Sequence, residues 1–136
     1  MKFLIVDDDS IARTLLAKHM ESYGKIDFAV DGEEAFDLFV KNQEQGTPYN
    51  LIFLDIMMPN VDGHSALLKI REWENEKKFA PEDGVKIVMT TALSDPKNIL
   101  SSFREGCEEY VIKPIQREKL LQVLASFGII EKGQAE

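Results

Sequence analysis

Residues 51–55 read LIFLD, an unbroken apolar run that ends in an aspartate. Such a run is typical of a parallel strand covered on both faces, because neither face then needs polar side chains. Residues 4–6 (LIV) also run directly into aspartates, and residues 87–89 (IVM) and 110–112 (YVI) are similar. Residues 26–30 are a weaker fifth candidate. The sequence therefore contains five candidate strands.

Stretches with the apolar spacing of helices separate these strands. Residues 12–23 can place their apolar side chains on one face, and we expect Ser10 as the N-cap and Gly24 as the C-terminal stop. Residues 31–34 (DGEE) resemble a capping box ahead of a second helix. Further helices are expected after Gly63, from Asp95-Pro96 to Gly106, and over residues 120–127.

Five alternating strand and helix units predict an α/β fold with a doubly wound parallel sheet and helices on both faces. Ligands of such folds bind at the carboxyl ends of the strands. We expect one domain over residues 1–128, a short tail over residues 129–136, and no output domain.

Composition limits the classes of function. The 136 residues are 44% hydrophobic and 29% charged, as in ordinary globular domains. A net charge of −8 disfavours binding to nucleic acid or to anionic membranes. The single Cys107 excludes an intrachain disulfide, and residues 1–6 are too short for a signal peptide or a membrane span. A cytoplasmic location is therefore predicted.

Polar residues follow four of the five strands. Residues 7–9 (DDD) follow the first, Asp55 ends the third, Thr90 and Thr91 end the fourth, and Lys113 follows the fifth. Clustered carboxylates repel one another unless a cation neutralises them, and all-oxygen ligands favour Mg²⁺. An aspartate can act as a nucleophile toward a phosphoryl group, whose oxygens a lysine and a threonine can contact.

Five fragments then carry a family resemblance. Val6-Asp7-Asp8, residues 54–59 (LDIMMP) with Asp62-Gly63, Thr91-Ala92 and residues 110–114 (YVIKP) resemble, in this order, the motifs of CheY-like receiver domains of response regulators. The resemblance spans about residues 2–127. It implies a flavodoxin-like strand order, 2-1-3-4-5, with five helices.

The resemblance also implies a role for each site residue. Asp55 is the expected phosphoacceptor, and Asp8, Asp55 and the backbone carbonyl of Met57 are expected to hold Mg²⁺, with Asp7 helping through water. Lys113 and Thr91 are expected to contact the phosphoryl oxygens.

A switch is implied as well. Thr91 and Tyr110 are expected to move together on phosphorylation, and the Lys113-Pro114 bond is expected to be cis. These changes would alter a target-binding face on the fourth helix, fifth strand and fifth helix. Its expected exposed positions are Lys97, Ser101, Arg104 and Lys119.

The function implied is that of a bacterial two-component response regulator. A histidine kinase or histidine phosphotransfer protein would supply the phosphoryl group. The chain would then bind a target, as in chemotaxis, or pass the group along a phosphorelay. It would not be an enzyme beyond self-catalysed transfer and autodephosphorylation. We expect a monomer, and a phosphorylation-dependent dimer stays open.

The main alternative is a phosphohydrolase of the haloacid-dehalogenase type with Asp7 as nucleophile. That hypothesis leaves residues 55–59 unexplained and the chain has little room for a substrate-selecting cap. We expect Asp9 to be solvated, His19 and His64 to be exposed or satisfied, and Cys107 to be a small buried apolar residue. The connections at 42–50 and 75–84 look longer than is usual for the family.

Overall fold

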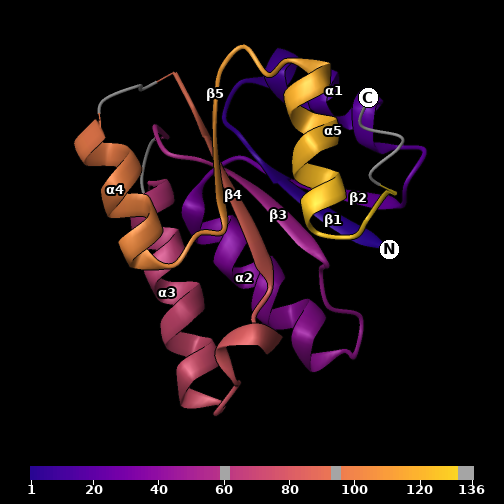
Figure 1. The fold of residues 1–136 in the computed structure, drawn as a ribbon. Helices are drawn as coiled ribbons and strands as arrows, with labels where there is room; N and C mark the ends of the chain where they lie inside the picture. Colours follow the sequence, from indigo (N-terminus) through magenta and orange to yellow (C-terminus); the bar gives the residue numbers. More distant parts are fainter. Residues whose placement is uncertain (59–61, 93–95, 132–136) are drawn as a thin grey trace.

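The computed structural model describes residues 1–58, 62–92 and 96–131 of the chain. In this part, a parallel sheet lies between two groups of helices (Figure 1). The strands are β1 (Lys2–Val6), β2 (Lys25–Ala29), β3 (Leu51–Asp55), β4 (Lys86–Thr91) and β5 (Glu109–Ile112). The helices are α1 (Ser10–Met20), α2 (Gly32–Glu44), α3 (Gly63–Glu76), α4 (Pro96–Glu105) and α5 (Arg117–Ser126), with a short 3-10 helix η1 (Pro81–Asp83).

The strand order is β2-β1-β3-β4-β5, and every neighbouring pair is parallel. Both the predicted fold class and the predicted order are confirmed. Because all strands point the same way, their carboxyl ends share one edge of the sheet. Asp55 lies opposite Thr90 there, and Thr91 lies opposite Ile112.

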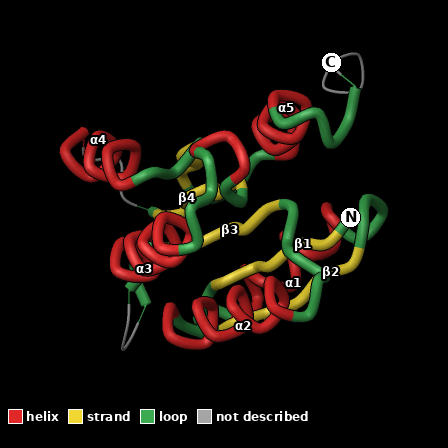
Figure 2. Tube along the Cα trace, turned by 90° about the horizontal axis from the view of Figure 1, so that it is seen from below, coloured by secondary structure: helices red, strands yellow, loops and turns green. Residues whose placement is uncertain are grey.

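Alternate residues of each strand face two separate cores. Leu4, Ile52 and Met89 belong to the core under α2, α3 and α4. Phe3 and Phe53 belong to the core under α1 and α5. Figure 2 shows the sheet between the two groups of helices. Both faces of the central strands are buried, which explains why β3 reads as a continuous apolar run.

Helix caps agree with the sequence in part. Asp31 accepts a hydrogen bond from the backbone N–H of Glu34, and Gly106 has φ +112° after α4, so these two predictions are confirmed. Ser10 as N-cap is wrong. The cap of α1 is Asp9, whose carboxylate accepts from the N–H of Ile11, and Ser10 is the first helical residue. The predicted cap Asp95 lies outside the described residues.

The apolar stripes of the helices are narrower than predicted. Leu15 of α1, Leu68 of α3 and Leu100 of α4 are each at least half exposed, at 56%, 50% and 51%. Their neighbours Leu16 and Leu67 are buried instead. Apolar spacing alone does not say which residues of a wide stripe meet the sheet.

The chain beyond α5 continues the packing of the second core. Ile130 is 7% exposed and Ile129 packs against the same core as Phe3 and Phe53. Of the two long connections, residues 42–50 begin with the last turn of α2, which runs to Glu44, and residues 75–84 contain η1. Among the described residues, no helix has the length and apolar character that crossing a membrane requires.

Candidate functional site

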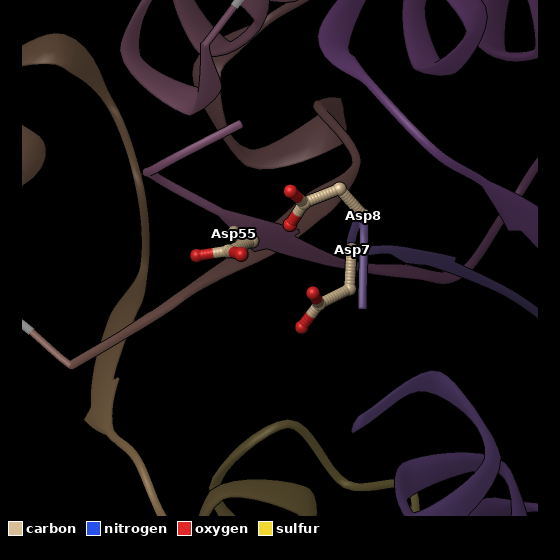
Figure 3. Close-up of side chains that lie close together, drawn as sticks. All are labelled: Asp7, Asp8 and Asp55. Carbon is tan, nitrogen blue, oxygen red and sulfur yellow. The ribbon is translucent and has the colours of Figure 1, made fainter. Parts of the chain in front are cut away.

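Three carboxylates meet at the carboxyl ends of β1 and β3. Oxygen atoms of Asp7, Asp8 and Asp55 all lie within 4.8 Å of one another, and Figure 3 shows the three side chains gathered beside these strand ends. Asp7 and Asp55 are each 5% exposed, whereas Asp8 is exposed to solvent. A compact turn sets this arrangement, because the carboxylate of Asp7 accepts the backbone N–H of Asp9 at 2.9 Å.

Lys113 brings a positive charge to the same place. Its ammonium Nζ lies 2.6 Å from Oδ2 of Asp7 and 3.3 Å from Oδ2 of Asp55. The Lys113–Pro114 peptide bond is cis, as predicted, and the N–H of Lys113 donates to the carbonyl of Thr91 at 2.7 Å. The loop after β5 is thereby held against the end of β4.

Burial and charge act together on the pKa values. Burial raises the pKa of Asp55 to about 6; the Lys113 charge opposes this rise and the Asp7 charge adds to it. Burial works to lower the pKa of Lys113, but its hydrogen bond to Asp7 and the charges of Asp55 and Asp7 outweigh it, so the pKa lies above its usual value. Lys113 stays charged, and its closer partner is Asp7. The site thus places a poorly solvated carboxylate next to an ammonium.

The described ends of the connection between β3 and α3 lie close to Asp55. The N–H of Gly63 donates to the carbonyl of Ile56, and a Cβ on Gly63 would lie 2.2 Å from the backbone oxygen of Asp55. Only glycine fits there. Asp62 caps α3 by accepting the N–H of Ser65, and the N–H of Met57 lies 3.3 Å from Oδ1 of Asp55. The Asp62-Gly63 pair therefore places the start of α3 directly against Asp55.

Thr91 and Tyr110 lie on one face of the sheet. Met89 belongs to the core under α3 and α4, so Thr91, two residues further on, faces the same side. Tyr110 pairs with Met89 and belongs to that core. Thr91 is 1% exposed and Tyr110 is 9% exposed. The side chain of Tyr110 is thus already packed inward.

Three residues next to the site could not be predicted as neighbours of it from the sequence. Arg13 donates from Nη1 to the backbone carbonyl of Asp7 at 2.7 Å. His64 and Asn98 line a pocket of about 520 Å³ that also includes Asp8 and Met57. None belongs to a spacing pattern, because α1, α3 and α4 are brought together only by the tertiary fold.

The expectations for Asp9, His64 and Cys107 are confirmed. Asp9 is exposed, although it has the added role of capping α1. His64 is satisfied by Glu105, with Nδ1 2.5 Å from Oε1. Cys107 is buried.

A sequence model of the response regulator receiver domain family matches residues 3–125. Over 126 residues the chain is 38% identical to the transcriptional regulatory protein ResD of Bacillus subtilis, covering 91% of this chain and 47% of ResD. It is 37% identical over 128 residues to the hybrid signal transduction histidine kinase L of Dictyostelium discoideum, covering 93% of this chain and 7% of that kinase. The chain thus spans less than half the length of these two relatives.

Solved structures with the same fold include two complexes. The complex of CheX, CheY, BeF3 and Mg²⁺ from Borrelia burgdorferi contains a chain that matches with a TM-score of 0.77 and 29% identity, covering 93% of this chain and 87% of that one. The complex of the Saccharomyces cerevisiae phosphotransfer protein Ypd1 with the receiver domain of Ssk1 matches with a TM-score of 0.79 and 25% identity, covering 94% and 88%. These matches leave the phosphohydrolase alternative without support. The chain belongs to the response regulator receiver domain family of two-component signalling proteins.

Proposed function

We propose that Asp55 accepts the phosphoryl group that this receiver domain takes from a histidine kinase or a histidine phosphotransfer protein. The observation that carries the proposal is the convergence of the Asp7, Asp8 and Asp55 carboxylates, two of which, Asp7 and Asp55, contact the ammonium of Lys113. A carboxylate oxygen of Asp55 would attack phosphorus, and the bond from phosphorus to the donor nitrogen would break. Receiver domains are signalling modules, and the chemistry stops at this transfer and at later hydrolysis.

The donor set at the site fits Mg²⁺. Three carboxylates within 4.8 Å of one another are hard oxygen ligands, and exposed Asp8 leaves room for water on the ion. We assign Asp8, Asp55 and the carbonyl of Met57 as the ligands, with Asp7 acting through water. When bound, Mg²⁺ would neutralise the charge on the transferring oxygens. The presence of Mg²⁺ in the Borrelia complex is consistent with this assignment.

Lys113 and Thr91 are proposed to bind the phosphoryl oxygens. The ammonium of Lys113 already lies within hydrogen-bond distance of both Asp7 and Asp55. It can therefore exchange its contact with Asp7 for one with the oxygens of a phosphoryl group on Asp55. Thr91 ends β4 on the α3 side, next to the strand that carries Asp55. Tyr110 completes the proposed switch on that side. Because Tyr110 is already buried, we propose that loading stabilises its inward position.

The proposed output is binding to a target protein at the face formed by α4, β5 and α5. Lys97, Ser101, Arg104 and Lys119 are all exposed there. A phosphoryl group can shift binding only by its different interaction with two states of this face. Either a chemotaxis-type target or a phosphorelay fits the proposal, as does a cytoplasmic location.

The test is phosphorylation by acetyl phosphate and Mg²⁺, followed by intact-protein mass spectrometry. Wild type should gain one phosphoryl group and Asp55→Asn should gain none. Asp9→Asn is the matched control, because Asp9 is in the same acidic run but outside the three-carboxylate group. It should be labelled like wild type.

Two results would contradict the proposal. Labelling that persists in Asp55→Asn and disappears in Asp7→Asn would show that Asp7, and not Asp55, is the nucleophile. Equal labelling of wild type in excess EDTA would show that the carboxylates need no divalent cation. Each arm therefore tests one part of the assignment.

A further inference from the structure

Asp8 is the exposed member of the three-carboxylate group. Asp7 and Asp55 are held by the ammonium of Lys113, whereas the carboxylate of Asp8 has no hydrogen bond or ion pair within the described part of the chain. Figure 3 nevertheless shows the side chain of Asp8 turned toward Asp55. The direction of this side chain therefore depends on the backbone that carries it.

Arg13 of α1 holds that backbone on both sides of Asp8. Its Nη1 donates to the carbonyl of Asp7 at 2.7 Å, and its own N–H donates to the carbonyl of Asp9 at 3.0 Å. The carbonyl of Asp7 belongs to the planar peptide group that joins Asp7 to Asp8. A donor bound to this carbonyl thus fixes the orientation of the plane from which Asp8 extends.

The bond from Arg13 to Asp7 is of a strong kind. Its donor is a charged guanidinium, and hydrogen bonds with a charged partner are stronger than neutral ones. Asp7 is 5% exposed, so its carbonyl has little access to water as an alternative donor. The guanidinium is bound to the backbone and not to the carboxylates, since no ion pair among the described residues involves Arg13.

We infer that Arg13 is a positioning residue for the divalent-cation site, because it fixes the peptide group between Asp7 and Asp8 so that the carboxylate of Asp8 faces Asp55. This role rests on the Mg²⁺ assignment of the proposed function. The charge of Arg13 by itself repels a cation, so removing that charge should strengthen Mg²⁺ binding. Removing the hydrogen bond should weaken it. The sign of the change therefore distinguishes the two effects.

Titration of the unphosphorylated protein with Mg²⁺, followed by amide NMR shifts, tests this role. Arg13→Met should raise the Mg²⁺ dissociation constant about tenfold, as is found when hydrogen-bond partners that orient metal ligands are lost. Lys18→Met is the matched control, because it removes a positive charge from an exposed position of the same helix. It should bind Mg²⁺ at least as tightly as wild type. Equal or tighter binding in Arg13→Met would overturn the inference.

Urea unfolding separates positioning from a purely structural role. Mg²⁺ raises the stability of the folded protein by an amount that depends on its affinity. A residue that only supports the fold would lower stability equally in EDTA and in Mg²⁺. Arg13→Met should instead lose part of the increase that Mg²⁺ gives, and an undiminished increase would overturn the positioning role.

Arg13→Lys covers the case in which Arg13→Met does not fold. The charge stays, but the shorter side chain reaches the carbonyl of Asp7 less well. The Mg²⁺ dissociation constant should rise about threefold, the effect of weakening one net hydrogen bond. Because the charge is unchanged, this loss reports the contact itself. Where Arg13→Met does not fold, an affinity of Arg13→Lys equal to that of wild type would overturn the inference.

Labelling by acetyl phosphate provides a second readout. Arg13→Met should need about tenfold more Mg²⁺ for its half-maximal rate, with a maximal rate close to that of wild type. A lower maximal rate with an unchanged Mg²⁺ requirement would contradict the positioning role. If wild type binds no Mg²⁺, the metal assignment fails and the role of Arg13 fails with it. If wild type binds Mg²⁺ but Asp55→Asn is still labelled, only the phosphoacceptor fails, and the Mg²⁺ titrations decide on Arg13.

Discussion

At the scale of single residues, the main electrostatic feature of the site is the ammonium of Lys113, which lies between the buried carboxylates of Asp7 and Asp55. The sequence suggested that a metal ion would be needed to relieve their repulsion. The structure shows that Lys113 supplies part of that neutralisation by contacting both Asp7 and Asp55. Lys113 was predictable as a site residue from its place after β5. Its pairing with Asp7 was not, because the sequence does not say which of the clustered carboxylates its ammonium contacts most closely.

Replacing Lys113 by methionine should therefore destabilise the protein in the absence of divalent cations. Asp7 and Asp55 would stay buried without their cation, and a loss of about 1 to 3 kcal/mol in the free energy of unfolding is expected. Mg²⁺ should restore part of this loss. Urea unfolding at pH 7 in EDTA and in Mg²⁺ measures both effects. Lys69→Met, on the surface of α3, is the control, and equal stability of Lys113→Met and this control in EDTA would contradict the pairing.

The thiol of Cys107 should be unreactive in the folded protein. Burial raises its pKa from 9.0 to about 12, and the nearby charge of Glu108 acts in the same direction. The thiolate is therefore much rarer at pH 8 than in an ordinary thiol with a pKa of 9.0. Alkylation at pH 8, followed by mass spectrometry, should be slow in buffer and fast in urea. Rapid modification of the native protein would show that the thiol is accessible.

At the scale of elements, the sequence predicted type and order well and packing details poorly. Strands β1 and β3 were evident because central parallel strands are apolar on both faces. Edge strand β2, with only Ala29 buried, was the weakest candidate for the same reason. The cap of α1 was misplaced by one residue because Asp9 and Ser10 are both good caps, and only the backbone geometry distinguishes them.

The position of that cap makes a direct prediction. Asp9→Ala should lower the free energy of unfolding by about 1 kcal/mol, because the N–H of Ile11 loses its acceptor. Ser10→Ala should have a much smaller effect, because Ser10 is already inside the helix. Urea denaturation of the two variants separates the assignments. A larger loss in Ser10→Ala would restore Ser10 as the cap.

At the scale of the whole molecule, the two cores divide the site into two halves. Thr91 faces the core under α3 and α4, while Thr90, its neighbour, follows Val88 toward the core under α1 and α5. Lys113 and Asp7 line a second pocket, of about 390 Å³, with α1. The sequence placed all these residues at one edge of the sheet. It could not assign them to faces, because that assignment depends on which core each strand residue meets in the folded protein.

This division predicts which threonine carries the signal of loading to the α4 face. With beryllofluoride and Mg²⁺ bound, wild type should show amide shift changes that extend from Asp55 to Tyr110 and to α4. In Thr91→Ala the changes should stay near Asp55, because the hydroxyl that would bind the phosphoryl group on the α3 side is gone and Tyr110 no longer senses it. Thr90→Ala removes the same hydroxyl one residue away and is the matched control.

In Thr90→Ala the response of α4 should remain, since Thr90 is 2% exposed but points to the opposite core. Both variants remove the same atoms from a buried position of β4. A difference between their responses therefore depends on which face of the sheet the side chain occupies and not on a general loss of stability. A response of α4 that survives in Thr91→Ala, or that disappears equally in both variants, would mean that the signal does not pass through the Thr91 side of the sheet. Phosphorylation of Asp55 would then be coupled to α4 by another route.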